Sequence, residues 1–93
     1  MVIDTPARPS IPGSLGQAPR FFSGSVHSIM VSEPNASLSA DEMERRLIEL
    51  GFVEGAQVTL LHEGLFGRDP IAVRVNGATV ALRRREAMSI KVL

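Results

Sequence analysis

Apolar residues recur at two different spacings along the chain, and the first spacing is that of strands. The segment 71–75 alternates apolar with other residues, so its Ile and two Val fall on one face. The segment 78–82 alternates in the same way. Asn76-Gly77 joins the two segments, and this dipeptide favours the tight turn that requires positive φ twice. The pattern predicts an antiparallel hairpin with one buried face.

The second spacing is helical and lies in residues 40–50. Ser39 is a suitable N-cap, because its hydroxyl can accept a hydrogen bond from a first-turn N–H, and Glu42 completes a capping box. Gly51 is placed to adopt the left-handed conformation that ends a helix. The predicted apolar face of this helix comprises Met43, Leu47 and Leu50. A helix of about three turns is unstable alone, so we expect it to pack on the strands.

Three further strands are predicted, at 21–31, 57–63 and 89–93. The connections are a loop at 32–38, a turn at Glu54-Gly55, a loop at 64–70 that ends in Asp69-Pro70, and one helical turn at 83–87. Short strands with one apolar face bury it best by curling into a barrel. We therefore predict a mainly β fold: a small SH3-like barrel of about five strands, with one short helix between strands 1 and 2. A small open antiparallel sheet backed by the helix is the alternative.

The first part of the chain differs in composition from the rest. Residues 1–20 contain four prolines among Gly, Ser and Ala, which is typical of a flexible leader. The Pro6-x-x-Pro9 spacing leaves open a role as a ligand for another domain. We assign residues 1–20 to the leader and residues 21–93 to the barrel domain.

Composition narrows the possible functions of this 93-residue chain. Ten basic and ten acidic residues balance, which argues against a general nucleic-acid binder. With four Phe and no Trp or Tyr, an aromatic groove for proline-rich peptides or a stacking platform for single strands is not expected. The chain has no cysteine, no apolar run long enough to span a bilayer and no signal-peptide pattern, so we expect a cytoplasmic protein.

Candidate chemistry is sparse. The glycine-containing segment 64–68 lacks the Lys-Ser/Thr end of a phosphate-binding loop, and no catalytic set is present, so we predict neither an enzyme nor a cofactor. His27 and His62 are the only histidines and are weak candidates for a divalent-metal site. Such histidines are more often ordinary surface or half-buried residues.

Two groups of residues are candidates for binding a partner. Arg83, Arg84 and Arg85 form the one basic cluster, which suits an acidic partner surface or phosphates unless it is simply a solvated turn. Leu65 and Phe66 lie in a predicted loop between glycines. They either cover one end of the barrel or are exposed for binding.

Several segments, in their order and spacing, resemble the FeoA family of ferrous iron transport proteins and the related C-terminal domains of iron-dependent repressors. The similar segments are 46–55 with Leu47, Leu50, Gly51 and Gly55, 65–71 with Asp69-Pro70, Asn76-Gly77, and 80–87. Glu54 stands where the family usually has proline.

The resemblance implies an SH3-like barrel and a cytosolic accessory role in bacterial ferrous iron uptake. The implied partner is FeoB, a membrane transporter with a GTP-binding domain, which would bring the protein to the inner membrane. A regulatory domain that binds nucleic acid or divalent metal is the alternative. A strand edge left open beside the loop at 32–38 leaves weak self-association possible.

Overall fold

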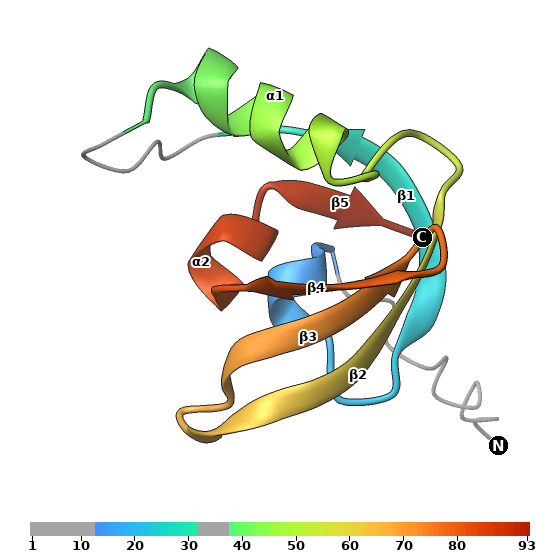
Figure 1. Cartoon of the computed structure of the whole chain (residues 1–93), viewed down its shortest axis with the longest axis vertical. Coiled ribbons are helices and arrows are strands. Elements are labelled where there is room, and N and C mark those ends of the chain that lie inside the picture. The colour runs from blue at the N-terminus through green and yellow to red at the C-terminus, as the bar shows by residue number, and fades with distance from the viewer. Residues whose placement is uncertain (1–12, 32–37) are drawn as a thin grey trace, which may run out of the picture.

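The computed structural model describes residues 13–31 and 38–93. Its elements are η1 (Leu15–Gln17), β1 (Ser23–Ile29), α1 (Ala40–Glu49), β2 (Gln57–Phe66), β3 (Asp69–Val75), β4 (Ala78–Leu82), α2 (Arg84–Ala87) and β5 (Ile90–Val92). The five strands form one antiparallel sheet in the order β4-β3-β2-β1-β5. Figure 1 shows the strands curling round a common interior, with α1 along one side. This is the mainly β barrel with a helix between the first two strands that the sequence predicts.

The alternating segments bury the residues that the pattern assigns to the interior. Ile71, Val73 and Val75 of β3 are buried, as is Leu82 of β4, while Val80 is half-buried against them. The other main core residues come from every remaining element: Leu15, Ala18, Val26, Leu47, Phe52, Val58, Leu60, Ala87, Ile90 and Val92. One continuous core therefore joins the strands, α1, α2 and η1.

Both ends of α1 form at the predicted residues, but the Glu42 carboxylate bonds the Ser39 hydroxyl and not, as a capping box requires, the Ser39 backbone N–H. The Ser39 hydroxyl accepts a hydrogen bond from the Glu42 N–H at 3.2 Å and donates one to the Glu42 carboxylate at 3.0 Å. At the other end Gly51 has φ of 111°, and the Phe52 N–H donates to the Leu47 carbonyl at 3.1 Å. This is the left-handed ending that closes a helix and directs the following residue into the core.

The prediction of a loop at 64–70 is wrong. β2 continues to Phe66 and β3 begins at Asp69, so the two strands form one long hairpin with a two-residue turn. Gly67 and Arg68 in this turn both have positive φ, 70° and 59°. In the sequence, the glycines and the Asp-Pro pair look like breaks in the strands. In the structure the pairing of β2 with β3 continues past them and shifts register between Glu63 and Phe66.

The predicted boundary of the leader at residue 20 is also too late. Leu15 and Ala18 are buried in the core, and Ser14 forms an isolated bridge with Lys91 beside β5. Residues 13–20 therefore pack on the barrel, although their composition is that of a flexible segment. Residues 1–12 of the predicted leader and most of the predicted loop at 32–38 lie outside the described residues.

Candidate interaction surface

The β2–β3 hairpin projects two large apolar side chains into solvent. Leu65 is 96% exposed and Phe66 is 89% exposed. Neighbouring residues of a strand point to opposite faces, so a strand lying against the protein body would bury one of the two. Since neither is covered, the end of the hairpin stands clear of the barrel, as Figure 1 shows at its lower left. The sequence left open whether Leu65 and Phe66 cover one end of the barrel or are exposed, and in the structure they are exposed. We call Leu65, Phe66, Gly67 and Arg68 the hairpin tip.

Arg84 holds the same hairpin at Glu63, at Asp69 and at the backbone of Arg68 in the tip. Four of its five guanidinium N–H groups are used: Nε donates to the Arg68 carbonyl at 2.7 Å, and Nη2 donates to the Glu63 carboxylate at 2.8 Å. Nη1 donates to the carbonyls of Gly16 at 3.1 Å and Ala18 at 2.8 Å. The Arg84 backbone N–H also donates to the Asp69 carboxylate at 2.8 Å. One side chain thus joins β2, the β2–β3 turn, α2 and the chain around η1.

Arg84 therefore has a different role from its two neighbours. Its side chain is only 19% exposed, and its bonds are internal, so it is not available to a partner in the way that the sequence analysis supposed. Arg83 and Arg85 are exposed, and neither makes an ion pair with a carboxylate in the part of the chain that the structure describes. The basic cluster thus consists of two accessible arginines around one structural arginine.

The carboxylates around this end of the molecule accept hydrogen bonds from other groups of the protein. Glu63 and Asp69 accept hydrogen bonds from Arg84. Glu86 pairs with Arg46 of α1 at 3.1 Å and accepts from the Arg83 backbone N–H at 3.1 Å. Asp69 has no cationic partner in the part of the chain that the structure describes, but three arginines outnumber it. The local excess of charge near the hairpin is therefore positive, although the chain as a whole is neutral. It is carried by Arg68 in the hairpin tip and by Arg83 and Arg85.

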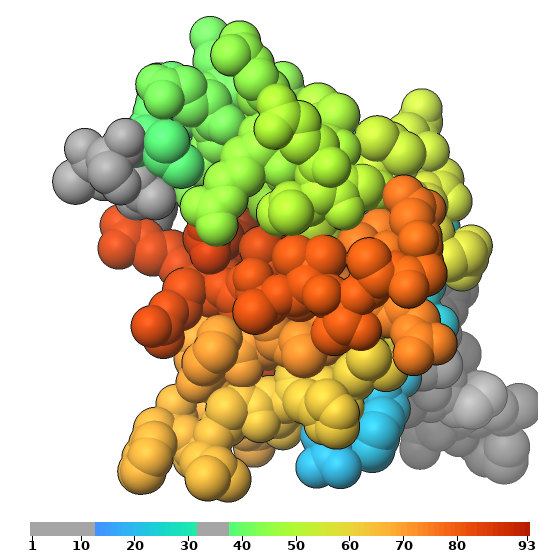
Figure 2. Space-filling model, in the orientation of Figure 1, coloured from blue at the N-terminus to red at the C-terminus, as the bar shows by residue number. Residues whose placement is uncertain are grey.

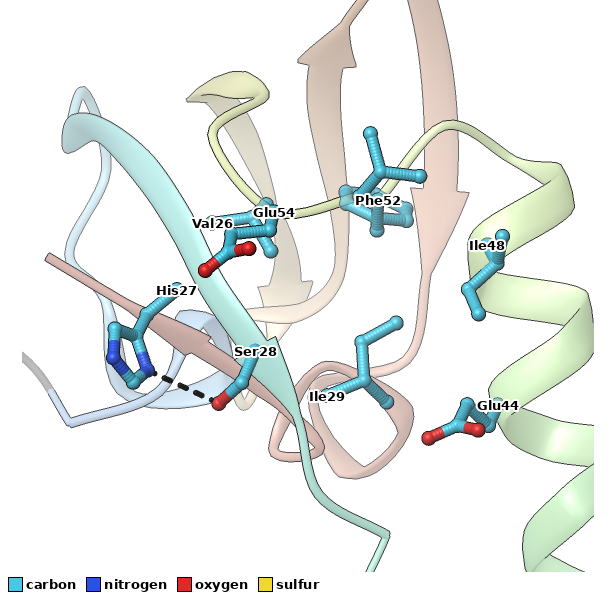
Figure 3. A pocket seen from close by; sticks show the side chains of 9 residues that line it. Val26, His27, Ser28, Ile29, Glu44, Ile48, Phe52 and Glu54 are labelled. Atoms are coloured by element: carbon cyan, nitrogen blue, oxygen red, sulfur yellow. Dashed lines mark hydrogen bonds between the residues drawn. The ribbon is translucent and has the colours of Figure 1, made fainter.

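A shallow apolar groove lies elsewhere, between α1 and β1 (Figure 3). Its volume is about 370 Å³. Ile29 of β1 and Ile48 of α1 point toward each other across it, with Glu44 near one end and Glu54 near the other. Ile48 and Val53 are about half exposed, at 46% and 45%. The sequence does not predict this groove, because Ile48 falls outside the apolar face of Met43, Leu47 and Leu50 and gives no separate signal.

The two histidines are not brought together. Ser23 pairs with Thr59 and Ser25 with Gln57, so His27 lies beyond one end of the β1–β2 ladder and His62 beyond the other. In this register position 27 faces position 55, and at about 3.3 Å per residue the rings are about 20 Å apart along the strands. The His27 ring instead bonds the neighbouring Ser28 hydroxyl at 3.1 Å, as Figure 3 shows. A metal site built from both histidines is thus incompatible with the fold.

Two further observations concern chemistry and membranes. Within residues 13–31 and 38–93, no three His, Cys, Asp or Glu side chains are grouped so that they could hold a metal ion. No helix in the same part of the chain has the length and apolar character needed to cross a bilayer.

Comparison with known proteins agrees with this structure. The model of the FeoA domain matches residues 20–93. The solved structure of FeoA from Stenotrophomonas maltophilia, a prokaryotic SH3 domain protein complexed with zinc, shares 34% sequence identity and a TM-score of 0.68, covering 85% of this chain and 87% of that one. FeoA from Chlorobium tepidum has the same identity and TM-score, with 85% and 67% of the two chains covered.

More distant structures share the fold. A FeoA-like protein from Clostridium acetobutylicum is 24% identical, with a TM-score of 0.70 over 89% of this chain and 88% of that one. A manganese-dependent transcriptional repressor matches at 23% identity and a TM-score of 0.65, covering 86% of this chain and 40% of the repressor. The search of curated protein sequences found no significant match. The family model and the two 34% identical structures show that this chain belongs to the FeoA family, which is associated with ferrous iron transport.

Proposed function

We propose that the protein is a cytoplasmic accessory factor of ferrous iron uptake that acts by binding the cytosolic GTP-binding region of a FeoB-type transporter. Membership of the FeoA family supports the link to ferrous iron transport. The transport step and the hydrolysis of GTP would belong to the partner. The role of this chain would be to modulate the transporter by contact, and the partner would recruit it to the inner membrane.

One observation carries the proposal: two large apolar side chains are held almost fully in solvent on a hairpin whose base is firmly anchored. Burying a Leu and a Phe is among the larger contributions that two residues make to binding. The anchored base reduces the conformational entropy that binding would otherwise cost. Arg83 directly before α2 and Arg85 on α2 lie next to this base and would add electrostatic attraction to an acidic partner surface. We therefore propose Leu65, Phe66, Arg83 and Arg85 as the contact residues and exclude Arg84.

The test is a titration of ¹⁵N-labelled protein with the soluble GTP-binding region of the transporter encoded by the same organism. We expect amide shifts or line broadening at residues 65–69 and 83–85. The double variant L65S/F66S should weaken binding at least about tenfold, because each side chain loses apolar burial.

The matched control is I48S/V53S, which also replaces two exposed apolar side chains but in the α1–β1 groove. If binding goes through the hairpin tip, this control retains the affinity of the wild type. If binding is lost in I48S/V53S and kept in L65S/F66S, the contact surface is the groove. If the wild type shows no shifts at high concentration, direct contact with this region of the transporter is excluded.

A further inference from the structure

The hairpin tip has the shape of a wedge rather than of a complementary surface. Leu65 and Phe66 are adjacent residues of β2 beside the register shift between Glu63 and Phe66, and both side chains are almost fully exposed. A protein partner would need a pocket shaped to the end of the hairpin to bury both side chains. The interface of a lipid bilayer accepts exposed Leu and Phe side chains without a shaped pocket.

The charges next to the wedge are suited to an anionic surface. Arg68 lies in the turn itself, directly after Phe66 and Gly67. Arg83 and Arg85 flank Arg84, whose guanidinium group contacts the Arg68 carbonyl. The nearby carboxylates of Glu63, Asp69 and Glu86 are all engaged in internal bonds. Of these three carboxylates only Asp69 has no cationic partner among the residues described here, since it accepts from a backbone N–H. Phosphate groups approaching this end would therefore meet three arginines, Arg68, Arg83 and Arg85, against one uncompensated carboxylate.

A second pairing of an arginine with an aromatic ring lies just before β1. The Arg20 guanidinium is stacked 4.5 Å from the centroid of the Phe21 ring, and Phe21 is largely exposed. The Phe21 N–H donates to the Leu60 carbonyl, so this turn lies beside the middle of β2. Figures 1 and 2 place the turn and the hairpin at the same lower end of the molecule.

The acidic residues gather on the other side. Asp41, Glu44 and Glu49 are exposed on α1, and Glu54 follows it. Figures 1 and 2 show α1 at the end of the molecule opposite the hairpin. Exposed arginines also lie away from the hairpin tip, Arg45 on α1 and Arg74 on β3, so the separation of charge is partial. The arginines beside the hairpin tip would still favour an orientation in which it faces a negatively charged surface.

We propose that the hairpin tip is a membrane-contact site: Leu65 and Phe66 insert into the interface of an anionic bilayer, and Arg68, Arg83 and Arg85 contact lipid phosphates. This goes beyond recruitment by a transporter, because the protein itself would bind lipid. The proposed contact with the transporter uses the same side chains, so lipid and transporter would compete for the hairpin tip.

The test uses the ¹⁵N-labelled full chain with vesicles of phosphatidylcholine containing about one-third phosphatidylglycerol, and with vesicles of phosphatidylcholine alone. A trace of lipid carrying a nitroxide near the top of its acyl chain reports which amides reach the bilayer. We expect selective broadening at residues 65–68 with the anionic vesicles. The broadening should weaken in high salt and be much smaller with the neutral vesicles.

L65S/F66S should reduce partitioning into anionic vesicles at least about tenfold, and R68Q should reduce it by a factor of about five. The controls are I48S/V53S and R45Q, which make the same changes at exposed positions around α1 and should bind as the wild type does. Far-ultraviolet circular dichroism of each variant verifies that it is folded.

Two results would overturn the proposal. One is the absence of vesicle binding by the wild type, or binding that is the same in L65S/F66S. The other is a variant L65S/F66S that loses only its affinity for the GTP-binding region of the transporter, which would make a protein the occupant of the tip. Because the vesicles contain no transporter, failure of this inference and failure of the proposed partner are separate results.

Discussion

The molecule contains two hairpins whose turns have the same backbone conformation but whose surroundings differ. Asn76 and Gly77 between β3 and β4 have φ of 50° and 77°, and Gly67 and Arg68 between β2 and β3 have φ of 70° and 59°. The first turn is tied to the end of α1, since the Asn76 side-chain amide donates to the Gly51 carbonyl at 3.4 Å. The second turn is held only through its backbone, where Arg84 Nε donates to the Arg68 carbonyl at 2.7 Å, and the side chains of Leu65 and Phe66 beside it remain exposed. Equal turn geometry thus serves to close the barrel in one hairpin and to present a surface in the other.

The difference lies in what the strands next to each turn bury. Val75 before the first turn is a fully buried core residue. Leu65 and Phe66 before the second turn are almost fully exposed, and Arg84 bonds that hairpin at the Glu63 carboxylate and the Arg68 carbonyl. Stability should therefore depend on the first turn and on the Arg84 contacts, whereas binding should depend on the exposed tip.

Removing the anchor of the projecting hairpin should have the largest effect on stability. We expect R84M to lower the free energy of unfolding by about 2–4 kcal/mol, because it removes four side-chain hydrogen bonds and leaves the partly buried Glu63 carboxylate without its partner. Urea unfolding followed by circular dichroism measures this. R85M makes the same change at an exposed neighbour and should stay within about 0.5 kcal/mol of the wild type. Equal losses in the two variants would show that Arg84 is not an anchor.

The two glycines allow a direct comparison of the turns. A Cβ at either Gly67 or Gly77 would meet no atom within 4 Å, so an alanine reports only the cost of the positive φ. G77A should destabilise the protein by about 1–2 kcal/mol. G67A should cost less, because the end of the projecting hairpin can fray without exposing the core. If G67A costs as much as G77A in urea unfolding, the tip is as tightly coupled to the barrel as the first turn.

The two turns also show how far the sequence predicts the fold. Asn76-Gly77 is a strong local signal, as are the Ser39 cap, Gly51 and the alternation along β3, and each of these predictions is confirmed. Gly67-Arg68 is a weak signal, because an arginine in the left-handed region is uncommon. Nothing local indicates that two strands continue through the glycines and Asp69-Pro70.

The other features that the sequence does not predict depend on contacts between residues that are distant in sequence. Leu15 lies in a Pro- and Gly-rich segment, and its burial follows only from packing on the barrel. Arg84 looks like Arg83 and Arg85 in the sequence, but the carbonyls that it bonds lie as far back in the chain as Gly16. The sequence alone does not give the register of β1 and β2, and it is this register that separates the rings of His27 and His62. Partner binding by the exposed residues stays a prediction.

A substitution at Arg68 in the second turn should raise the stability of the protein, whereas the substitutions above lower it. Asn tolerates the left-handed region better than Arg, so R68N should stabilise the protein by a few tenths of a kcal/mol. The same variant removes a positive charge from the hairpin tip and should weaken binding to anionic vesicles. A loss of stability in urea unfolding would indicate that the Arg68 side chain makes a stabilising contact.

The smallest effect on stability is expected at the most exposed side chains. L65S/F66S should change the free energy of unfolding by less than about 0.5 kcal/mol, because neither side chain is buried in the folded protein. V73A in the neighbouring strand should instead cost about 2 kcal/mol or more, since Val73 is completely buried. A large loss of stability in L65S/F66S would mean that the tip packs on the barrel.

Uptake of ferrous iron by cells that lack the chromosomal copy of this gene tests the central claim most directly. The cells would carry the wild type, L65S/F66S or I48S/V53S at equal protein levels, and uptake of radioactive ferrous iron would be measured. We expect the wild type and I48S/V53S to restore uptake, whereas the stable but tip-deficient L65S/F66S does not. Full restoration by L65S/F66S would contradict the claim that the protein acts through its projecting hairpin.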